Sequence, residues 1–205
     1  MGNQDHWEGV YSRRGVTDVS WYTPHLARSL EVMDEVGIEP SAAVIDVGGG
    51  ASTLVDDLLD RGFRDVTVLD LASAALEVSR ARLGERGDSV TWRVDDVLEA
   101  DFEPGRYDVW HDRAVFHFLT DPAKRDRYVA QVSKAVKPGG HVILATFALD
   151  GPERCSGLPV ARYDADGIHA AFGPRFEKLG SLAETHNTPA GKSQAFTWCY
   201  CLRLE

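Results

Sequence analysis

Short apolar runs rich in β-branched residues alternate along this chain with segments whose apolar residues recur at helical spacing. The runs predict strands at residues 44–47, 66–70, 90–94, 107–111 and 141–147. The helical spacing predicts helices from Thr23-Pro24 to Gly37, from Leu54 to Gly62, over 73–83 and from Asp121-Pro122 to Pro138. Strands that alternate with helices in this way predict βαβ units, and therefore a parallel sheet that helices cover on both faces.

The last third of the chain departs from this alternation. After a loop rich in Gly and Pro, a short helix is predicted from Asp164 to Phe172, and paired strands are predicted over 176–184 and 194–204. Apolar residues alternate with other residues along the final strand, which suits a strand that joins the sheet in antiparallel fashion. The expected fold is therefore a single-domain α/β fold: a doubly wound, seven-stranded, mostly parallel sheet with an antiparallel last strand and helices on both faces.

Charge and cysteine content narrow the class of protein. A formal net charge of −10 over 205 residues disfavours nucleic-acid binding, which depends on neutralising phosphates with Lys and Arg. The three cysteines, Cys155, Cys199 and Cys201, are too few and too scattered for a disulfide framework or a zinc motif, so no metal is expected and the cytoplasm is the expected compartment. The N-terminus lacks the features of a signal peptide, and no apolar run is long enough to cross a bilayer, so no membrane association is expected.

Three consecutive glycines separate the first strand from the helix that follows it. The stretch from Val44 to Thr53 contains Gly48, Gly49 and Gly50, an arrangement in which main chain and exposed amide groups closely approach a nucleotide-like ligand. The next three strands are followed by acidic residues or histidine, at Asp70, Asp95-Asp96 and His111-Asp112. The carboxyl ends of parallel strands meet at one edge of the sheet, so these groups predict a nucleoside site there.

The nearest alternative is a dinucleotide site. Its fingerprint requires Gly or Ala where this chain has Thr53. The chain instead follows the pattern Asp-x-Gly-x-Gly-x-Ser, from Asp46 to Ser52, and Lys137-Pro138-Gly139-Gly140 precedes the fifth strand. Together with the acidic strand ends, this combination resembles the class I, seven-β-strand, S-adenosylmethionine-dependent methyltransferases over nearly the whole chain.

The resemblance implies S-adenosylmethionine as the cofactor and S-adenosylhomocysteine as its product. The first motif, Asp46, Gly48, Gly49, Gly50 and Ser52, would lie at the methionine part, with Trp21 and His111 also in the cofactor pocket. Asp70 would hold the ribose, and Leu71 would lie against the adenine. Asp96 with Val97 would hold the adenine amino group, and Asp95 is an adjacent candidate. Ser52 stands where many members have a third glycine, which affects only the local turn.

The resemblance also divides the single domain, residues 1–205, into three segments. Residues 1–23 form an aromatic arm, 24–147 the cofactor-binding core, and 148–205 a substrate-side loop and C-terminal hairpin. The aromatic residues of the arm, Trp7, Tyr11, Trp21 and Tyr22, either pack over the core or form a lid that binds the sulfonium by cation–π attraction.

Methyl transfer from a sulfonium requires a base only if the nucleophile arrives protonated. The candidate catalytic residues are His111, Asp112 and His117, which follow the fourth strand beside the expected methyl position. In the alternative interpretations His111 only lines the cofactor pocket, His117 makes a helix contact and Asp112 orients a substrate amine. Arg113 is interpreted as a solvated charge. Cys155, on the loop after the fifth strand, is favoured as a pocket-lining thiol over a nucleophile.

Three functions fit these features. The first is methylation of a small-molecule acceptor at O, N or S, because no appended domain for macromolecular recognition is visible. The second is protein lysine methylation, since Asp112-Arg113 is similar to an Asp-Lys-Gly-Thr segment of some lysine methyltransferases of this fold, although Ala114-Val115 replaces Gly-Thr. An acidic protein would also attract a basic target. The third is a cofactor-binding module without activity. The sequence does not indicate an oligomeric state.

Overall fold

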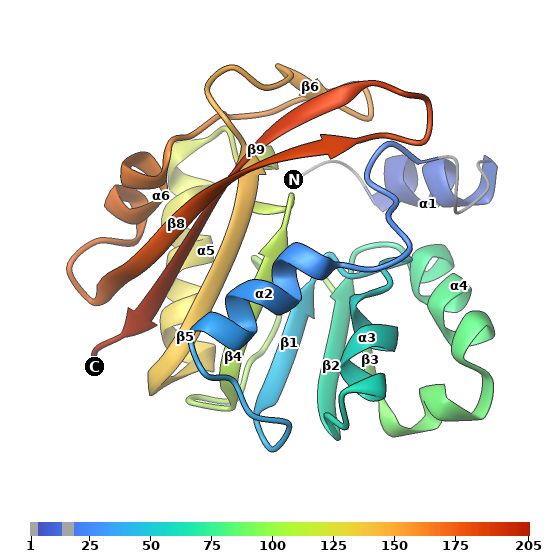
Figure 1. Ribbon diagram of the computed structural model, residues 1–205, viewed down its shortest axis with the longest axis horizontal. Helices are drawn as coiled ribbons and strands as arrows, with labels where there is room; N and C mark the ends of the chain where they lie inside the picture. The colour runs from blue at the N-terminus through green and yellow to red at the C-terminus, as the bar shows by residue number, and fades with distance from the viewer. Residues whose placement is uncertain (1–3, 14–18) are drawn as a thin grey trace.

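The computed structural model describes residues 4–13 and 19–205. Seven strands form its central sheet: β1 (Ala43–Val47), β2 (Asp65–Asp70), β3 (Thr91–Val94), β4 (Tyr107–Arg113), β5 (Val136–Phe147), β8 (Phe176–Asn187) and β9 (Ser193–Arg203). Their order across the sheet is β3-β2-β1-β4-β5-β9-β8 (Figure 1). β9 is antiparallel to both of its neighbours, while the other strands run in one direction. The expected α/β fold with an antiparallel last strand is confirmed.

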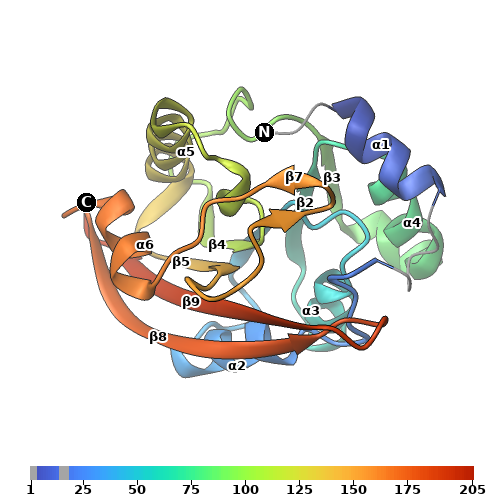
Figure 2. The same ribbon diagram turned by 90° about the horizontal axis from the view of Figure 1, so that it is seen from above.

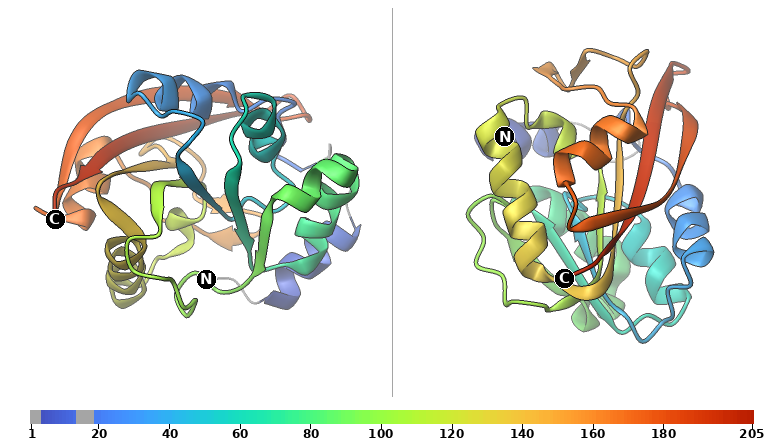
Figure 3. Two further views of the ribbon diagram at one scale, coloured as in Figure 1. Left: turned by 90° about the horizontal axis from the view of Figure 1, so that it is seen from below. Right: turned by 90° about the vertical axis from the view of Figure 1, so that its left-hand side faces the viewer.

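Helices cover both faces of this sheet. On one face lie α5 (Pro122–Ala135) and α6 (Ala165–Phe172), and on the other lie α2 (Ala27–Glu35) and α3 (Leu54–Asp60) (Figure 3). α4 (Ser73–Leu83) contacts β2 and β3 and contributes to the same apolar cluster as α2 and α3. The core therefore consists of two apolar clusters, one against each face of the sheet.

The alternation of side chains along β4 assigns neighbouring residues to different clusters. Trp110 packs in the cluster of α5 and α6, whereas Val109 packs in the cluster of α2. Asp112 lies on the same face of β4 as Trp110 and is hydrogen-bonded to Tyr128 of α5. His111 lies on the same face as Val109 and is hydrogen-bonded to Ser29 of α2. Residues 111 and 112 are thus directed to opposite layers of the protein.

The same alternation is confirmed in β9. Phe196, Trp198 and Tyr200 belong to the cluster on the α2 face. Cys199 and Cys201 belong to the cluster on the α5 face, where both are buried as free thiols. The interpretation of these two cysteines as packing residues is therefore confirmed.

Two element boundaries differ from the prediction. α2 begins at Ala27 rather than at Thr23-Pro24, and the Thr23 hydroxyl donates to the His25 carbonyl instead of capping a helix. α5 ends at Ala135 rather than continuing to Pro138, because Val136 already pairs with Tyr107 of β4. The ladder then resumes with His141 opposite Val109, so residues 137–140 bulge out of β5, and Gly139 has a φ of +77° there.

Two elements near the carboxyl ends of the parallel strands have no counterpart in the sequence-based prediction. One is α1 (Gln4–Arg13), a short helix that has no fully buried residue. The other is a short hairpin of β6 (Arg154–Cys155) and β7 (Leu158–Pro159). Both lie above the central strands, with α1 next to α4 (Figure 2). Within the described ranges, no helix is long and apolar enough to span a membrane.

Candidate functional site

The three glycines after β1 form a turn that only glycine can build. Gly48 and Gly50 have φ of +69° and +24°, in the region that side chains disfavour. A Cβ on Gly48 would lie 2.1 Å from the Val115 side chain, and one on Gly50 would lie 2.5 Å from Asp70 Oδ2. The amides of Gly48 and Gly49 donate to the Leu69 carbonyl, at 2.7 and 3.3 Å, which ties this turn to the end of β2.

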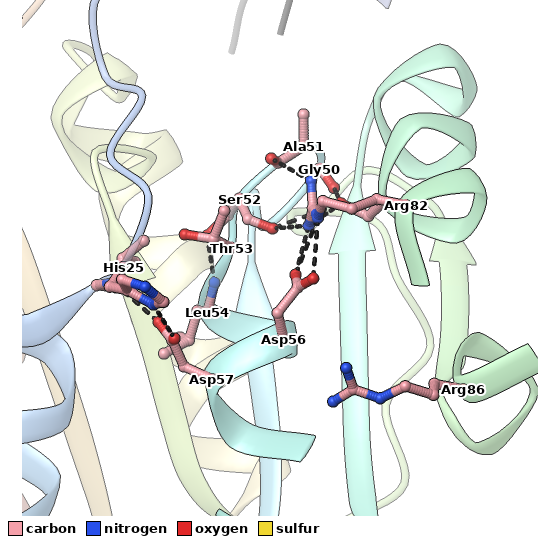
Figure 4. Close-up of polar contacts among 12 residues, drawn as sticks. His25, Gly50, Ala51, Ser52, Thr53, Leu54, Asp56, Asp57, Arg82 and Arg86 are labelled. Atoms are coloured by element: carbon pink, nitrogen blue, oxygen red, sulfur yellow. Dashed lines mark hydrogen bonds and ion pairs between the residues drawn. The ribbon is translucent and has the colours of Figure 1, made fainter. Parts of the chain in front are cut away.

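The Arg82 side chain of α4 reaches the main chain of the turn (Figure 4). Arg82 donates to the carbonyls of Ala51 and Ser52, at 3.2 and 2.6 Å, and also pairs with Asp56 of α3 at 2.6 Å. The Ser79 hydroxyl donates to the Gly50 carbonyl at 2.7 Å. The carbonyl groups of the turn are therefore satisfied by α4. Sequence reasoning missed Arg82, because its partners lie about thirty residues away.

Two adjoining pockets open at the carboxyl ends of the strands. The first runs past the ends of β2 and β3, where it is lined by Gly48, Asp70, Leu71, Asp95 and Val97. The second runs along the glycine turn, where it is lined by Asp46, Gly49, Ser52, Thr53 and His111. The residues common to both pockets are Tyr11, Trp21, Gly48 and Arg113. These pockets bring together most of the cofactor-binding residues predicted from the sequence.

Asp70 is a buried carboxylate at the point where the first pocket meets the glycine turn. Its Oδ1 accepts a hydrogen bond from the Ala72 amide at 2.8 Å. Burial raises the pKa of Asp70 to about 7, and the nearby charge of Asp46 acts in the same direction. The carboxyl therefore changes charge near neutral pH in the absence of a ligand.

Of the two acidic residues after β3, Asp95 lines the pocket and Asp96 does not. Asp95 pairs with Arg93 at 2.9 Å, and its amide donates to the Asp70 carbonyl at 3.0 Å. Asp96 Oδ1 instead accepts from the Leu98 amide at 2.9 Å and so stabilises the turn after the strand. The pocket wall at this position thus comes from Asp95 and Val97, while Asp96 lies between them in sequence.

His111 is the middle member of a buried polar chain between Asp46 and Ser29. Its Nδ1 lies 2.7 Å from Asp46 Oδ1, and its Nε2 lies 2.9 Å from the Ser29 hydroxyl. Both ring nitrogens are therefore engaged within the protein. Asp46 Oδ2 is buried and has no hydrogen-bond partner among the described residues. An anionic oxygen without a partner, next to the glycine turn, is suited to a cationic ligand group such as the ammonium of a methionine part.

The other two predicted catalytic residues, Asp112 and His117, do not line either pocket. Asp112 is buried on the α5 face, where it accepts hydrogen bonds from the Val115 and Phe116 amides, at 2.7 and 3.0 Å, and from the Tyr128 hydroxyl at 2.5 Å. Burial raises its pKa to about 6. These contacts hold the turn after β4, so we do not carry Asp112 into the proposed site.

His117 is equally removed from the pockets. Its ring lies between Phe118 and Phe147, with centroids 4.5 and 4.8 Å away. Burial, together with the charge of Arg113, lowers the pKa of His117 to about 3, so the imidazole is neutral. His117 therefore packs between aromatic rings, one of them on strand β5, rather than making the helix contact of the alternative interpretation.

Arg113 is partly buried and lines both pockets, so its interpretation as a solvated charge is wrong. Arg113 lies on the same face of β4 as His111, because side chains two residues apart on a strand point in the same direction. The sequence alone could therefore have placed it near the site. Its Nη1 donates to the Trp21 carbonyl at 3.2 Å, and its guanidinium lies 4.9 Å from the Phe196 ring centroid. Its Nη2 is buried without a hydrogen-bond partner among the described residues, and burial lowers its pKa from the usual value.

Ala114 has a left-handed backbone, with φ of +75°. It occupies the position of the glycine in the Asp-Lys-Gly-Thr segment that this region resembles. Glycine adopts this conformation without strain, whereas a non-glycine residue there typically costs about 1–3 kcal/mol. The left-handed conformation at Ala114 is thus one that a glycine at this position would adopt without strain.

Aromatic side chains close the remaining wall of the first pocket. Trp7 of α1 contacts Trp21 and Phe118, with ring centroids 6.1 and 5.2 Å apart, and Tyr11 contacts Trp21 at 6.1 Å. Cys155 of β6 completes this wall, and burial raises the pKa of its thiol to about 11. The aromatic arm thus lines the pocket, and Cys155 is a protonated lining thiol near neutral pH.

Comparison with known proteins agrees with this geometry. A family model for a methyltransferase domain matches residues 44–140. The eEF1A lysine and N-terminal methyltransferase of Mus musculus is 27% identical over 154 residues, which make up 72% of this chain but only 22% of that protein. The ubiquinone biosynthesis O-methyltransferase of Pectobacterium carotovorum is 36% identical over 106 residues, 51% of this chain and 42% of that protein. The chain therefore spans less than half of the length of either relative.

A solved structure shows the same fold. It is the 1,6-didemethyltoxoflavin-N1-methyltransferase of Burkholderia thailandensis, with bound 1,6-didemethyltoxoflavin and S-adenosylhomocysteine. Its TM-score is 0.69 at 20% identity, over 98% of this chain and 84% of that chain. The strand order, the glycine turn with its acidic strand ends and the matching family model lead to one assignment. The chain belongs to the class I S-adenosylmethionine-dependent methyltransferase family.

Proposed function

We propose that the protein transfers the methyl group of S-adenosylmethionine to an oxygen, nitrogen or sulfur atom of a small-molecule acceptor. The observation that carries this proposal is the junction of the two pockets at Tyr11, Trp21, Gly48 and Arg113. A nucleoside in the first pocket and an amino-acid part in the second would place the sulfonium between them, at this junction. The bound cofactor would supply an electrophilic methyl carbon and a neutral thioether leaving group.

The residues of each pocket fit the part of the cofactor assigned to it. Asp70 would accept hydrogen bonds from the ribose hydroxyls, while Leu71, Asp95 and Val97 would surround the adenine. The unpartnered Asp46 Oδ2 would receive the ammonium of the methionine part. The rings of Trp21 and Tyr11 would attract the sulfonium, an interaction worth about 0.5–2 kcal/mol.

The shape of the remaining space supports a small acceptor. Trp7 of α1, Phe118 and Cys155 of β6 also line the first pocket. An acceptor enclosed by these groups would be held in line with the methyl group and away from water, which is the main contribution this site can make to a displacement reaction. No separate binding domain is needed for such a substrate.

Protein lysine methylation is the second candidate. It is favoured by the likeness to the mouse eEF1A lysine and N-terminal methyltransferase and by the left-handed residue after Arg113, where the lysine methyltransferase segment has glycine. The net charge of −10 would also attract a basic protein. We nevertheless rank it second, because the space beside the junction is walled by α1 and β6.

We also propose that the protein works in the cytoplasm. All three cysteines are free thiols in the structure, and all three are buried. Free thiols are typical of proteins in a reducing compartment.

The cofactor proposal is tested by calorimetry with S-adenosylmethionine and S-adenosylhomocysteine. Both should bind the wild-type protein, and Asp70→Ala should weaken both by about 1–3 kcal/mol, the cost of one charged hydrogen-bonding group. Asp101→Ala is a matched control, since Asp101 is an exposed carboxylate paired with Lys134. Binding of neither compound, or equal binding by the Asp70 variant, would contradict the proposal.

The acceptor is tested by transfer of an isotope-labelled methyl group, read out by mass. The wild-type protein is offered small thiols, phenols, carboxylates and amines in one arm and a protein lysate in the other. The proposal predicts label in the small molecules. Label confined to lysine residues of lysate proteins would establish the second candidate instead, and cofactor binding with no transfer in either arm would indicate a binding module.

A further inference from the structure

Among the described residues that line the two pockets, Arg113 is the only Lys or Arg. None of the ion pairs between described residues involves it. Its protein contacts are the Trp21 carbonyl and the face of Phe196, and its Nη2 is buried without a partner among the described residues. A buried guanidinium with a free donor is suited to bind an anion.

The position of Arg113 makes this unpaired charge unusual. The guanidinium lies at the junction of the two pockets, where the sulfonium of the cofactor is expected. Two cations that are brought together in a site sheltered from water repel each other. The carboxylates whose charges act on Arg113 are Glu184, which accepts from Trp198 Nε1, and Asp46, which is engaged by His111. A third partner that carries negative charge would relieve this repulsion.

Among the described residues that line the pockets, none beside Arg113 is suited to accept a proton. Tyr11 and Cys155 carry dissociable protons in the first pocket. Burial raises the pKa of Tyr11 well above its usual value and that of Cys155 to about 11, so both are protonated near neutral pH. His111 has both ring nitrogens engaged, and Asp70 and Asp95 line the nucleoside side. A nucleophile that arrives with its proton would have no residue to receive it.

We propose that Arg113 selects methyl acceptors whose attacking oxygen or sulfur is already an anion near neutral pH: small thiolates, acidic phenolates or enolates, and carboxylates. This inference rests on the proposed methyltransferase function and specifies its substrate class. The guanidinium binds the anion next to the methyl position and disfavours ammonium groups, which would place a third positive charge there.

The reaction balances without a base. A lone pair of the acceptor anion forms the new bond to the methyl carbon, and the electrons of the broken carbon–sulfur bond remain on sulfur. One negative and one positive charge disappear together, and no proton moves. An amine acceptor, in contrast, must first lose one proton from its ammonium form and a second after methylation to regain neutrality, and the lining residues offer no group for either step.

Three anions and two controls test the proposal on the 205-residue protein. Thiophenol, 4-nitrophenol and benzoate are compared with benzylamine and benzyl alcohol at pH 7.5, and methylated products are measured by mass. At least one anion should be methylated, with no product from benzylamine or benzyl alcohol. Methylation of benzylamine in preference to all three anions would overturn the proposal while leaving the methyltransferase function intact.

A binding measurement separates recognition from turnover. Calorimetry compares benzoate with benzamide on the wild-type protein saturated with S-adenosylhomocysteine, and benzoate should bind at least about tenfold more tightly. Equal affinity, or no binding and no methylation of any of the three anions, would overturn the proposal. This arm uses only the wild-type protein, so it does not depend on how a variant folds.

Variants of Arg113 assign the effect to this side chain. Arg113→Gln should lower kcat/KM for the preferred anion by about a hundredfold, and Arg113→Lys should retain part of it because it keeps the charge but not the planar fork. Arg61→Gln, which removes a surface ion pair with Asp34, is the control. The affinity of Arg113→Gln for S-adenosylhomocysteine should stay within about threefold of wild type. A loss of about thirtyfold would mean that the guanidinium binds the cofactor carboxylate and would overturn the proposal.

Discussion

Asp46 Oδ1 lies 2.7 Å from Nδ1 of His111, and both side chains are buried beneath the glycine turn. The two residues face each other on adjacent parallel strands, since Asp46 of β1 is paired in register with His111 of β4. The imidazole is anchored at its other nitrogen by Ser29 of α2. This arrangement fixes the orientation of the Asp46 carboxylate, so we expect His111 to act by positioning Asp46.

His111→Asn tests this role. The variant should lose about 1–3 kcal/mol of unfolding free energy, because buried polar partners are left unsatisfied. Its affinity for S-adenosylhomocysteine should also fall, while kcat at saturating cofactor should fall by less than about tenfold. Ser29→Ala, which removes only the contact at Nε2, is the control. A general base would behave differently: kcat would drop about 10²–10⁴-fold with cofactor affinity unchanged.

Asp70 should make cofactor binding depend on pH. Its pKa in the free protein is raised to about 7, chiefly by burial, and ribose hydroxyls would donate to its ionised form. Binding therefore favours loss of the proton, so affinity should rise with pH up to about 7 and remain constant above it. Below pH 7 the dissociation constant should increase by up to about tenfold per pH unit. Calorimetry from pH 5.5 to 8.5 measures this, and Asp70→Asn should bind with a flat profile.

The same carboxylate should affect stability in the opposite sense. Because the folded pKa lies above the ordinary value of 3.8, the unfolded chain releases this proton first as pH rises. The contribution of Asp70 to stability is present below pH 4 and is lost as pH rises to about 7. Asp70→Asn should therefore gain stability relative to wild type over this window in urea titrations of the free protein. A difference between the two proteins that is the same at pH 4 and pH 7 would contradict the assigned pKa.

Arg82 should influence cofactor affinity although it lines neither pocket. It holds the Ala51 and Ser52 carbonyls and the Asp56 carboxylate behind the turn (Figure 4). Arg82→Met should weaken S-adenosylhomocysteine binding by about tenfold, the effect of losing roughly one supporting hydrogen bond to a charged group. Arg86→Met is the matched control, since Arg86 lies directly after α4 in the chain and forms a surface ion pair with Asp60. Equal effects of the two substitutions would contradict a positioning role for Arg82.

Asp112 should matter for stability and not for chemistry. Asp112→Asn replaces an acceptor of three hydrogen bonds with a group that presents donors to the Phe116 amide or the Tyr128 hydroxyl. Urea denaturation should show a loss of about 1–3 kcal/mol. Asp101→Asn, at an exposed ion pair, should lose much less. The affinity of the folded Asp112 variant for cofactor should be near wild type, and a selective loss of kcat would instead restore Asp112 as a catalytic candidate.

Glu8 should control how α1 closes the pocket. Its carboxylate accepts hydrogen bonds from the Ser73 and Ala74 amides at the start of α4, at 2.7 and 3.1 Å, while the neighbouring Trp7 lines the pocket. Glu8→Ala removes a carboxylate from a helix N-terminus, an interaction worth about 0.3–1 kcal/mol. S-adenosylhomocysteine should therefore bind about two- to fivefold more weakly. Glu77→Ala, in an exposed pair with Arg80 on the same helix, should bind normally.

The sequence by itself determined the strands and most of the residues that line the two pockets. Strand periods, the glycine turn and the acidic strand ends are local features, because they follow from which residues stand next to each other in the chain. The order of the parallel strands also brings their carboxyl ends together, so Asp46 and Asp70 line adjoining pockets as expected, together with Asp95, the second of the two candidates after the third strand. The sequence did not predict the α1 helix or the bulge in β5, because each depends on contacts with distant segments. The α1 helix packs next to α4, and the bulge follows from the pairing of β5 with Tyr107.

Only the tertiary structure decided which of two adjacent residues serves the site. Asp95 lines the pocket and Asp96 caps a turn, while His111 and Asp112 point to opposite faces of β4. Sequence places such neighbours together, but burial and hydrogen-bonding partners come from other strands and helices. Arg113 shows this most clearly: its charge was evident in the sequence, whereas its burial between Trp21 and Phe196 required segments about ninety residues before it and eighty after it to converge.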